Sequence, residues 1–314
     1  MRWFDGFEQR WFEANGVSIN ARVSRVEPGA ALRPALLLLH GFPQSHAMWH
    51  RVAQLLAQNY FLVMPDLRGY GDSSKNVGLP DHSNYSKRSL ASDMVVVMDA
   101  LGVKGSFFVC GHDRGGRVAH RLALDHAARV KKLCVIDIAP TLDMYSGAGM
   151  KEGQPYMAFA QAYYHWFHML QPTPLPETMM GANHPPTAKA YLHAKLGGWG
   201  SAAGLAHIEP QALAEYERCF CNPEALHAAC EDYRASVGID LAHDRTSREQ
   251  GQRVLCDMLV LWGAHGVVQR LFDPMALWQA QCSAKVTGQA LPAGHFIPEE
   301  LPEATASALR GFFE

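Results

Sequence analysis

An aspartate stands in a glycine-rich turn between an apolar run and a helical pattern. The run 106–110 leads into the segment GHDRG at 111–115, whose central residue is Asp113. Glycine permits the sharp backbone turn that presents a nucleophile between a central strand and a helix. A helix N-terminus also favours an ionised carboxylate. We therefore predict that Asp113 is a nucleophile; an aspartate that only caps the helix is the alternative.

Two arginines follow this aspartate within the first helical turn. Arg114 and Arg117 place positive charge where the helix dipole disfavours it, so helix stability does not explain them. Arg117 comes four residues after Asp113 and can share its helix face. Because guanidinium groups bind carboxylates through paired hydrogen bonds, we predict that both arginines hold the carboxylate of an anionic substrate. The alternative is that one arginine only neutralises Asp113.

A histidine near the end of the chain is the expected general base. His295 follows the last apolar run, 285–291, and precedes the final helical pattern, 299–313. This is the place of the base in chains whose nucleophile lies on a strand–turn–helix turn. Any of the 16 histidines could lie at the surface, and its position distinguishes His295 from the others.

The acid that orients His295 has two possible positions. One is the loop after the run 258–262, which contains no carboxylate before Asp273. The other is the apolar run 133–138, which contains Asp137. A lone carboxylate in apolar surroundings is costly unless it has a partner, so we predict Asp137 as the partner of His295.

The segment HGFPQ at 40–44 completes the expected site. It follows the apolar run 35–39, at the place where a second donor for a developing oxyanion is expected. We predict that the backbone N–H groups of Phe42 and Arg114 form this oxyanion site.

The elements that must position these residues alternate along the chain. Near-continuous apolar runs suit parallel strands covered on both faces, and helical patterns at 89–101 and 116–128 separate them. This alternation predicts an α/β fold with a mostly parallel, doubly wound sheet. The runs lie at 35–39, 61–64, 106–110, 133–138 and 258–262.

The alternation stops near residue 140 and resumes near 254. The intervening segment is rich in methionine and aromatic residues, and its patterns are helical. We predict a helical cap (lid) at 141–253, inserted into a core domain formed by 1–140 and 254–314. A lid lined with aromatic side chains over the strand ends would exclude water from a site below it.

Composition and charge exclude several classes of protein. The 28 Lys+Arg and 30 Asp+Glu give a formal net charge of −2, which argues against a nucleic-acid partner. No apolar run reaches the ~18 residues that a membrane span needs. The N-terminal segment 1–16 lacks the apolar stretch of a signal peptide, so we expect a cytoplasmic protein. The seven cysteines form no CxxC pair, and no HExxH motif occurs, so we predict no disulfide framework and no metal site.

Several motifs together resemble the fluoroacetate (haloacetate) dehalogenases of the α/β-hydrolase superfamily. GHDRGGR with YHWF and EDYRA is the specific combination, whereas HGF and PDLRGYGDS are typical of the whole superfamily. The resemblance implies an α/β-hydrolase fold with an inserted cap, no cofactor, and a homodimer. The motifs are HGFPQ at 40–44, PDLRGYGDS at 65–73, GHDRGGR at 111–117, DIAPT at 137–141, YHWF at 164–167, EDYRA at 231–235 and GHF at 294–296.

The resemblance also implies an activity and further site residues. The activity is hydrolytic dehalogenation of a small-molecule haloacid to glycolate and halide, through an ester on the aspartate. The resemblance assigns halide binding to His165, Trp166 and Tyr233, and a place in the cavity wall to Trp199. An epoxide hydrolase with the same aspartate nucleophile is the alternative, and the paired arginines argue against it because its substrate is uncharged.

Overall fold

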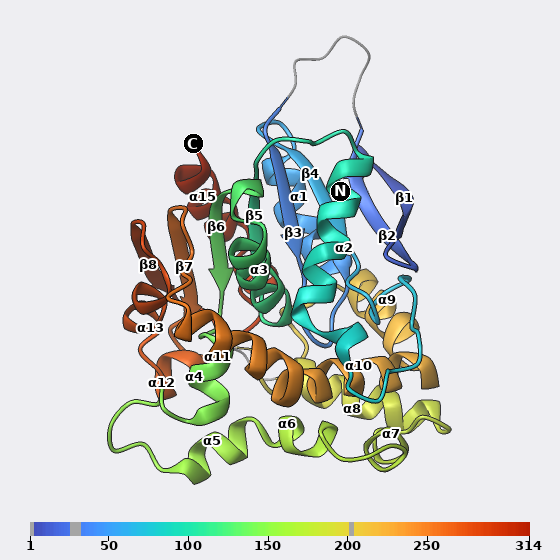
Figure 1. Cartoon of the computed structure of the whole chain (residues 1–314). Coiled ribbons are helices and arrows are strands. Elements are labelled where there is room, and N and C mark those ends of the chain that lie inside the picture. Colours follow the sequence, from blue (N-terminus) through green and yellow to red (C-terminus); the bar gives the residue numbers. More distant parts are fainter. Residues whose placement is uncertain (1–2, 26–32, 201–203) are drawn as a thin grey trace.

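An eight-stranded sheet forms the centre of the protein (Figure 1). The computed structural model describes residues 3–25, 33–200 and 204–314. The strand order is β1-β2-β4-β3-β5-β6-β7-β8; β2 is antiparallel to its two neighbours, and the other pairings are parallel. The predicted fold class is thereby confirmed. The strands are β1 Phe7–Ala14, β2 Val17–Ser24, β3 Ala35–Leu39, β4 Phe61–Pro65, β5 Phe107–His112, β6 Val130–Ile136, β7 Met258–Gly263 and β8 Val286–Leu291.

Strands β3 to β7 correspond to the predicted apolar runs. Their residues are mostly buried because helices cover both faces of the sheet. The sequence did not predict the hairpin of β1 and β2. In β1 most side chains are exposed, so no continuous apolar run marks this edge strand.

The core helices pack in two layers. In Figure 1, α2 (Lys87–Ala100) and α3 (Arg114–Asp125) lie in front of the sheet. Helix α15 (Pro302–Phe313) lies behind it and packs against α1 (His50–Leu56). No helix in the described ranges is long and apolar enough to cross a membrane. Three short helices complete the core elements: α12 Val267–Leu271, α13 Pro274–Gln281 and α14 Ile297–Glu300.

The prediction of one helix over 299–313 was wrong, because the chain forms α14 and α15 there. Leu301 separates them with φ −136° and ψ 61°. Pro302 follows, and the residue before a proline is sterically disfavoured from the helical conformation.

A group of helices between β6 and β7 covers the carboxyl ends of the parallel strands (Figure 1). We call them the cap helices. The division into domains at residues 140/141 and 253/254 remains a proposal. The cap helices are α4 Thr141–Ser146, α5 Tyr156–Ala162, α6 Tyr164–Met169, α7 Leu175–Met179, α8 Pro185–Gly197, α9 Pro210–Phe220, α10 Pro223–Ala235 and α11 Leu241–Glu249.

Candidate active site

Asp113 occupies a strained turn between β5 and α3. Its backbone has φ 49° and ψ −115°, a conformation that costs about 1–3 kcal/mol for a non-glycine residue. The flanking glycines make the turn possible. A Cβ at Gly111 would lie 2.3 Å from the carbonyl oxygen of Gly115, and a Cβ at Gly115 would lie 2.3 Å from that of His40. The glycine pattern therefore has a steric cause, and the turn presents Asp113 at the carboxyl end of β5, which the cap helices cover.

The two oxygens of the Asp113 carboxylate have different surroundings. The backbone N–H of Phe42 donates a hydrogen bond of 3.0 Å to Oδ1. Nε2 of His295 lies 4.0 Å from Oδ2, which is longer than a hydrogen bond. One oxygen is therefore held by a backbone donor, and the other is free to react.

His295 and Asp137 form a tight buried pair. Nδ1 of His295 lies 2.6 Å from Oδ2 of Asp137, and the backbone N–H of Gly263 donates to the other carboxylate oxygen at 3.0 Å. Burial lowers the pKa of His295, but the hydrogen bond and charge of Asp137, with the charge of Asp113, outweigh it and raise the pKa. Asp273, the other candidate acid, instead caps α13 by accepting the N–H of Ala276.

The two arginines are buried behind the rings of Tyr233 and Trp166 and do not line the cavity, and within the described residues neither forms an ion pair with Asp113. Nε of Arg114 donates to Asp232 at 2.8 Å, and one of its terminal nitrogens donates to Ser236 at 2.6 Å. Arg117 donates to Thr141 at 2.9 Å. Nη1 of Arg114 and Nε of Arg117 are buried and have no hydrogen-bond partner. The predicted carboxylate clamp would use such vacant donors, and this role remains a prediction.

Sequence reasoning missed the acid that holds Arg114. Asp232 lies on α10, is fully buried, and also forms an ion pair with Lys87 and accepts the hydroxyl of Tyr70 at 2.7 Å. Burial alone would raise the pKa of Asp232, but the charges of Arg114 and Lys87 outweigh it and lower the pKa. Asp232 lies in the EDYRA motif, next to Tyr233. Because a buried carboxylate needs a cationic partner, this acidic residue could have pointed to the contact with Arg114.

The helix that carries Asp232 is irregular at this point. A π-helical turn, Ser236–Asp240, joins α10 to α11. Ser236 accepts from Arg114, and Asp240 accepts the backbone N–H of Lys87 at 2.7 Å. This one segment of the cap therefore contacts both Arg114 and Lys87.

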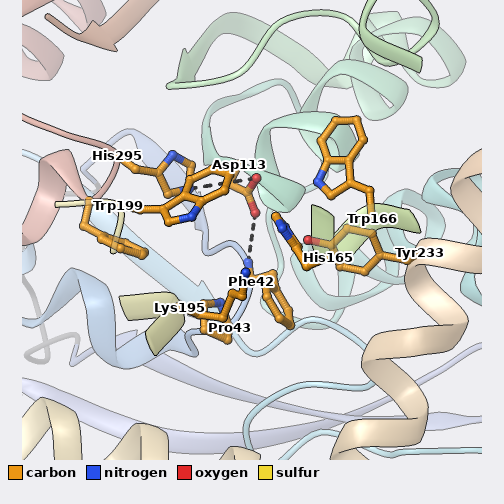
Figure 2. A pocket seen from close by; sticks show the side chains of 10 residues that line it. Phe42, Pro43, Asp113, His165, Trp166, Lys195, Trp199, Tyr233 and His295 are labelled. Carbon is orange, nitrogen blue, oxygen red and sulfur yellow. Dashed lines mark hydrogen bonds and ion pairs between the residues drawn. The ribbon is translucent and has the colours of Figure 1, made fainter. Parts of the chain in front are cut away.

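The cap residues assigned by resemblance surround a small cavity above Asp113 (Figure 2). Its volume is about 20 Å³, and burial is nearly complete for His165, Trp166 and Tyr233. The sequence neighbours His165 and Trp166 both line the cavity, and their ring planes are inclined at 81° to each other. The cavity is lined by Phe42, Pro43, Asp113, His165, Trp166, Lys195, Trp199, Tyr233, His295 and Phe296.

Trp199 and Lys195 form part of the same wall. Trp199 lines the cavity as expected, and its carbonyl oxygen accepts the backbone N–H of His295 at 2.8 Å. The sequence did not indicate Lys195, because a lone lysine in a helical segment is usually at the surface.

A second buried carboxyl connects the cap to the core beside the site. Glu299 on α14 accepts a hydrogen bond from the hydroxyl of Tyr216 on α9 and one of 3.0 Å from the amide of Gln44. Burial raises the pKa of Glu299 to about 8, although the hydrogen bond from Tyr216 and the charge of Arg51 oppose this. The folded protein therefore favours the neutral form of Glu299.

This raised pKa predicts a pH-dependent loss of stability. The contribution of Glu299 is complete below its ordinary pKa of 4.5 and is lost as pH rises through about 8. Glu299→Gln stays neutral, so its melting temperature relative to the wild type should increase from pH 5 to pH 9, by more than about 2 °C. Thermal denaturation at both pH values measures this, and a constant difference would contradict the prediction.

Comparisons with known proteins show the family of the chain. The alpha/beta hydrolase fold family matches residues 34–300. The chain belongs to this family. It is 44% identical to a fluoroacetate dehalogenase from Burkholderia sp over 98% of this chain and 94% of that protein. A soluble epoxide hydrolase from Corynebacterium sp. (strain C12) is 28% identical over 88% of this chain and 89% of that protein.

Solved structures give the same result. A crystal structure from Nostoc sp PCC 7120, assigned to the alpha/beta hydrolases, is 49% identical and covers 99% of both chains with a TM-score of 0.89. The resemblance to the fluoroacetate dehalogenases is thus confirmed along nearly the whole chain, and with it the prediction of a hydrolase.

Proposed function

We propose that the protein hydrolyses short 2-haloacids such as fluoroacetate or another haloacetate to glycolate and halide. The observation that carries the proposal is a carboxylate in a strained turn, beside a buried His–Asp pair and close to vacant guanidinium donors. A carboxylate nucleophile suits displacement at a saturated carbon, and the arginines suit an anionic substrate. The 44% identity to a fluoroacetate dehalogenase supports the same reaction class.

The first step is displacement of halide by Asp113. Oδ2, the oxygen without a backbone donor, attacks the carbon that carries the halogen; the carbon–halogen bond breaks and halide leaves with its electron pair. The product is a carboxymethyl ester on Asp113. His165, Trp166 and Tyr233 would supply the ring N–H and hydroxyl donors for the developing halide. The imidazole of His165 is suited to this as a neutral donor, because burial lowers its pKa well below the ordinary value.

The second step is hydrolysis of the ester by water. His295 takes a proton from water, and the resulting hydroxide attacks the ester carbonyl carbon. Charge develops on Oδ1, which already accepts the N–H of Phe42, and the N–H of Arg114 is the second proposed donor. The bond between Cγ and Oδ2 then breaks, the departing glycolate oxygen takes the proton held by His295, and Asp113, which now carries the oxygen of water, releases a proton and returns to the carboxylate. Asp137 orients His295 and stabilises its charged form.

A substrate comparison tests the proposal directly. Purified protein is incubated with fluoroacetate, chloroacetate and styrene oxide, while halide release and diol formation are measured. Halide release from the haloacetates without diol formation supports the proposal. Diol formation without halide release would favour the epoxide hydrolase alternative, and no turnover of any of the three would indicate a fold of this family with little catalytic activity.

Substitution of the arginines should separate charged from neutral ligands. Arg114→Met and Arg117→Met should weaken haloacetate binding much more than haloacetamide binding, because a charge-assisted hydrogen bond is worth roughly 1.5–3 kcal/mol. Arg117→Met is the cleaner test, since Arg114 also partners buried Asp232. Calorimetric titration measures both ligands. Equal losses for the two would mean that the arginines are structural.

Removal of a halide donor should affect fluoride more than the heavier halides. Trp166→Phe and Tyr233→Phe each delete one donor and keep the aromatic ring. Fluoride concentrates its charge and leaves poorly, and loss of one donor at a developing charge costs about 2.7–4 kcal/mol of barrier. Single-turnover ester formation should therefore slow more with fluoroacetate than with chloroacetate. Equal slowing would mean that these residues only shape the cavity.

We also propose a cytoplasmic homodimer, as the sequence and the resemblance imply. Apolar side chains exposed on one run of cap helices, α5 to α7, support a self-association surface. Light scattering of the purified protein measures its mass in solution, and a monomer at micromolar concentration would contradict the dimer. The exposed side chains are Tyr156, Met157, Tyr164, Phe167, Leu175 and Met179.

A further inference from the structure

Lys195 is a buried cation in the wall of the cavity. It lies on α8, is only 5% exposed, and lines the same space as Asp113 and His295 (Figure 2). Its Nζ lies 3.7 Å from the ring centre of Tyr164 and 5.6 Å from that of Tyr191. No carboxylate lies within ion-pair distance of this ammonium in the described parts of the chain.

Among the described residues, buried Arg117 also lacks an anionic partner, whereas other buried cations of the protein have one. Lys87 pairs with Asp232 and Asp240, and Arg121 pairs with Asp244. A charged amine without a partner is costly to bury, and an aromatic face compensates only part of that cost. Burial accordingly lowers the pKa of Lys195 to about 7. An anion bound in the cavity would supply the missing partner.

Lys195 lies between the cavity, whose wall it helps to form, and the ring of Tyr164 on α6. The ring that its ammonium contacts, Tyr164, is 49% exposed. The arginines lie on another side: Arg114 lies over the ring of Tyr233 at 4.1 Å, and Arg117 over that of Trp166 at 5.2 Å. Lys195 in the cavity wall is therefore separate from the pair Arg114 and Arg117, which lies behind other lining residues.

We propose that Lys195 is an anion-binding residue that contacts the carboxylate of a haloacid from the cavity wall and selects anionic over neutral substrates. The carboxylate then passes to the vacant donors of Arg114 and Arg117. The proposal rests on the proposed dehalogenase function, and it gives Lys195 a role in substrate capture but none in bond breaking.

Kinetics of two variants test this role. Lys195→Met removes the charge with little loss of volume, and Lys195→Arg keeps it. For fluoroacetate, kcat/KM should fall about tenfold or more in Lys195→Met, while kcat changes less than about twofold. Lys195→Arg should retain most of kcat/KM. A fall in kcat with unchanged KM, or equal loss in both variants, would overturn the proposal.

Ligand binding tests it without turnover. Calorimetry should show that Lys195→Met loses affinity for acetate but not for acetamide. In the wild type, acetate affinity should fall as pH rises through about 7, because the amine loses its proton. Other titratable groups lie near this cation, so the pH dependence of acetate affinity in the wild type is compared with that in Lys195→Arg. Arginine stays charged, so the fall in affinity should be absent in this variant. These groups are His165, His168, His295, Asp113, Tyr164 and Tyr191.

The two proposals can fail separately. If Lys195→Met does not fold, the pH comparison with Lys195→Arg still decides, since identical profiles would overturn the role of Lys195. Loss of acetate and acetamide affinity together would also overturn it. Absence of halide release by the wild type would refute the dehalogenase function, whatever the acetate titrations show.

Discussion

Replacement of Asp113 by Asn is expected to abolish dehalogenation while the fold is retained. An amide cannot displace halide, so kcat should fall by at least about 10⁴-fold, as when the nucleophile of a catalytic unit is removed. Asparagine has nearly the same size and shape as aspartate, and its carbonyl oxygen can still accept the N–H of Phe42, so the turn should persist. Halide release by freshly purified protein measures the effect.

Two controls make this result decisive. The melting temperature of Asp113→Asn should stay near that of the wild type, and mass spectrometry should exclude deamidation back to aspartate. Full activity in a folded, undeamidated variant would remove Asp113 from the role of nucleophile. Glu299→Gln also replaces a buried carboxyl by an amide, but Glu299 is not one of the reacting groups. This variant should keep its activity and serves as the matched control.

Replacement of His295 by Asn is expected to stop the reaction at the ester. Attack by Asp113 needs no base, and the 4.0 Å between Nε2 of His295 and Oδ2 leaves that oxygen without a direct bond to the ring. Hydrolysis of the ester does need a base, and loss of general base catalysis costs about 10²–10⁴-fold. One equivalent of halide should be released per protein, and steady turnover should cease.

Mass spectrometry identifies the trapped intermediate. After exposure of His295→Asn to haloacetate, the peptide that contains Asp113 should carry a carboxymethyl group, and Asp113→Asn treated in the same way should not. If haloacetate is shown to bind and no adduct forms, the two-step mechanism is wrong. An adduct on a different peptide would move the nucleophile elsewhere.

The pH dependence of the second step follows from the same pair. His295 accepts a proton only when neutral, and the hydrogen bond and charge of Asp137 keep its pKa above the ordinary value of 6.5. Ester hydrolysis should therefore accelerate as pH rises through that raised pKa, whereas ester formation by Asp113 needs no deprotonation of His295.

Local sequence was sufficient for the turn and the strands of the core. The glycines around Asp113 are required by contacts within a few residues or with the neighbouring strand, and their spacing predicts the turn together with the apolar run before it and the helical pattern after it. Buried parallel strands are continuous apolar runs, which a sequence displays directly. The pairing of His295 with Asp137 was predictable because parallel strands bring their carboxyl ends to one edge.

The sequence alone was weaker where a strand or helix lacks a local signal. The hairpin of β1 and β2 is exposed along much of its length, so apolar content does not reveal it. The break between α14 and α15 depends on a single residue, Pro302, and a helical pattern continues across it.

The sequence by itself determined the aspartate turn and the contact of His295 with Asp137, because neighbouring residues and strand ends set them. Only the tertiary structure decided what surrounds them. Asp232 contacts Arg114 and Lys87, from which it is separated by 118 and 145 positions in the sequence. These contacts exist only when the cap helices lie on the core. The isolation of Lys195 has the same origin, since burial of a charge without a partner is a property of packing and leaves no mark on the residues beside it.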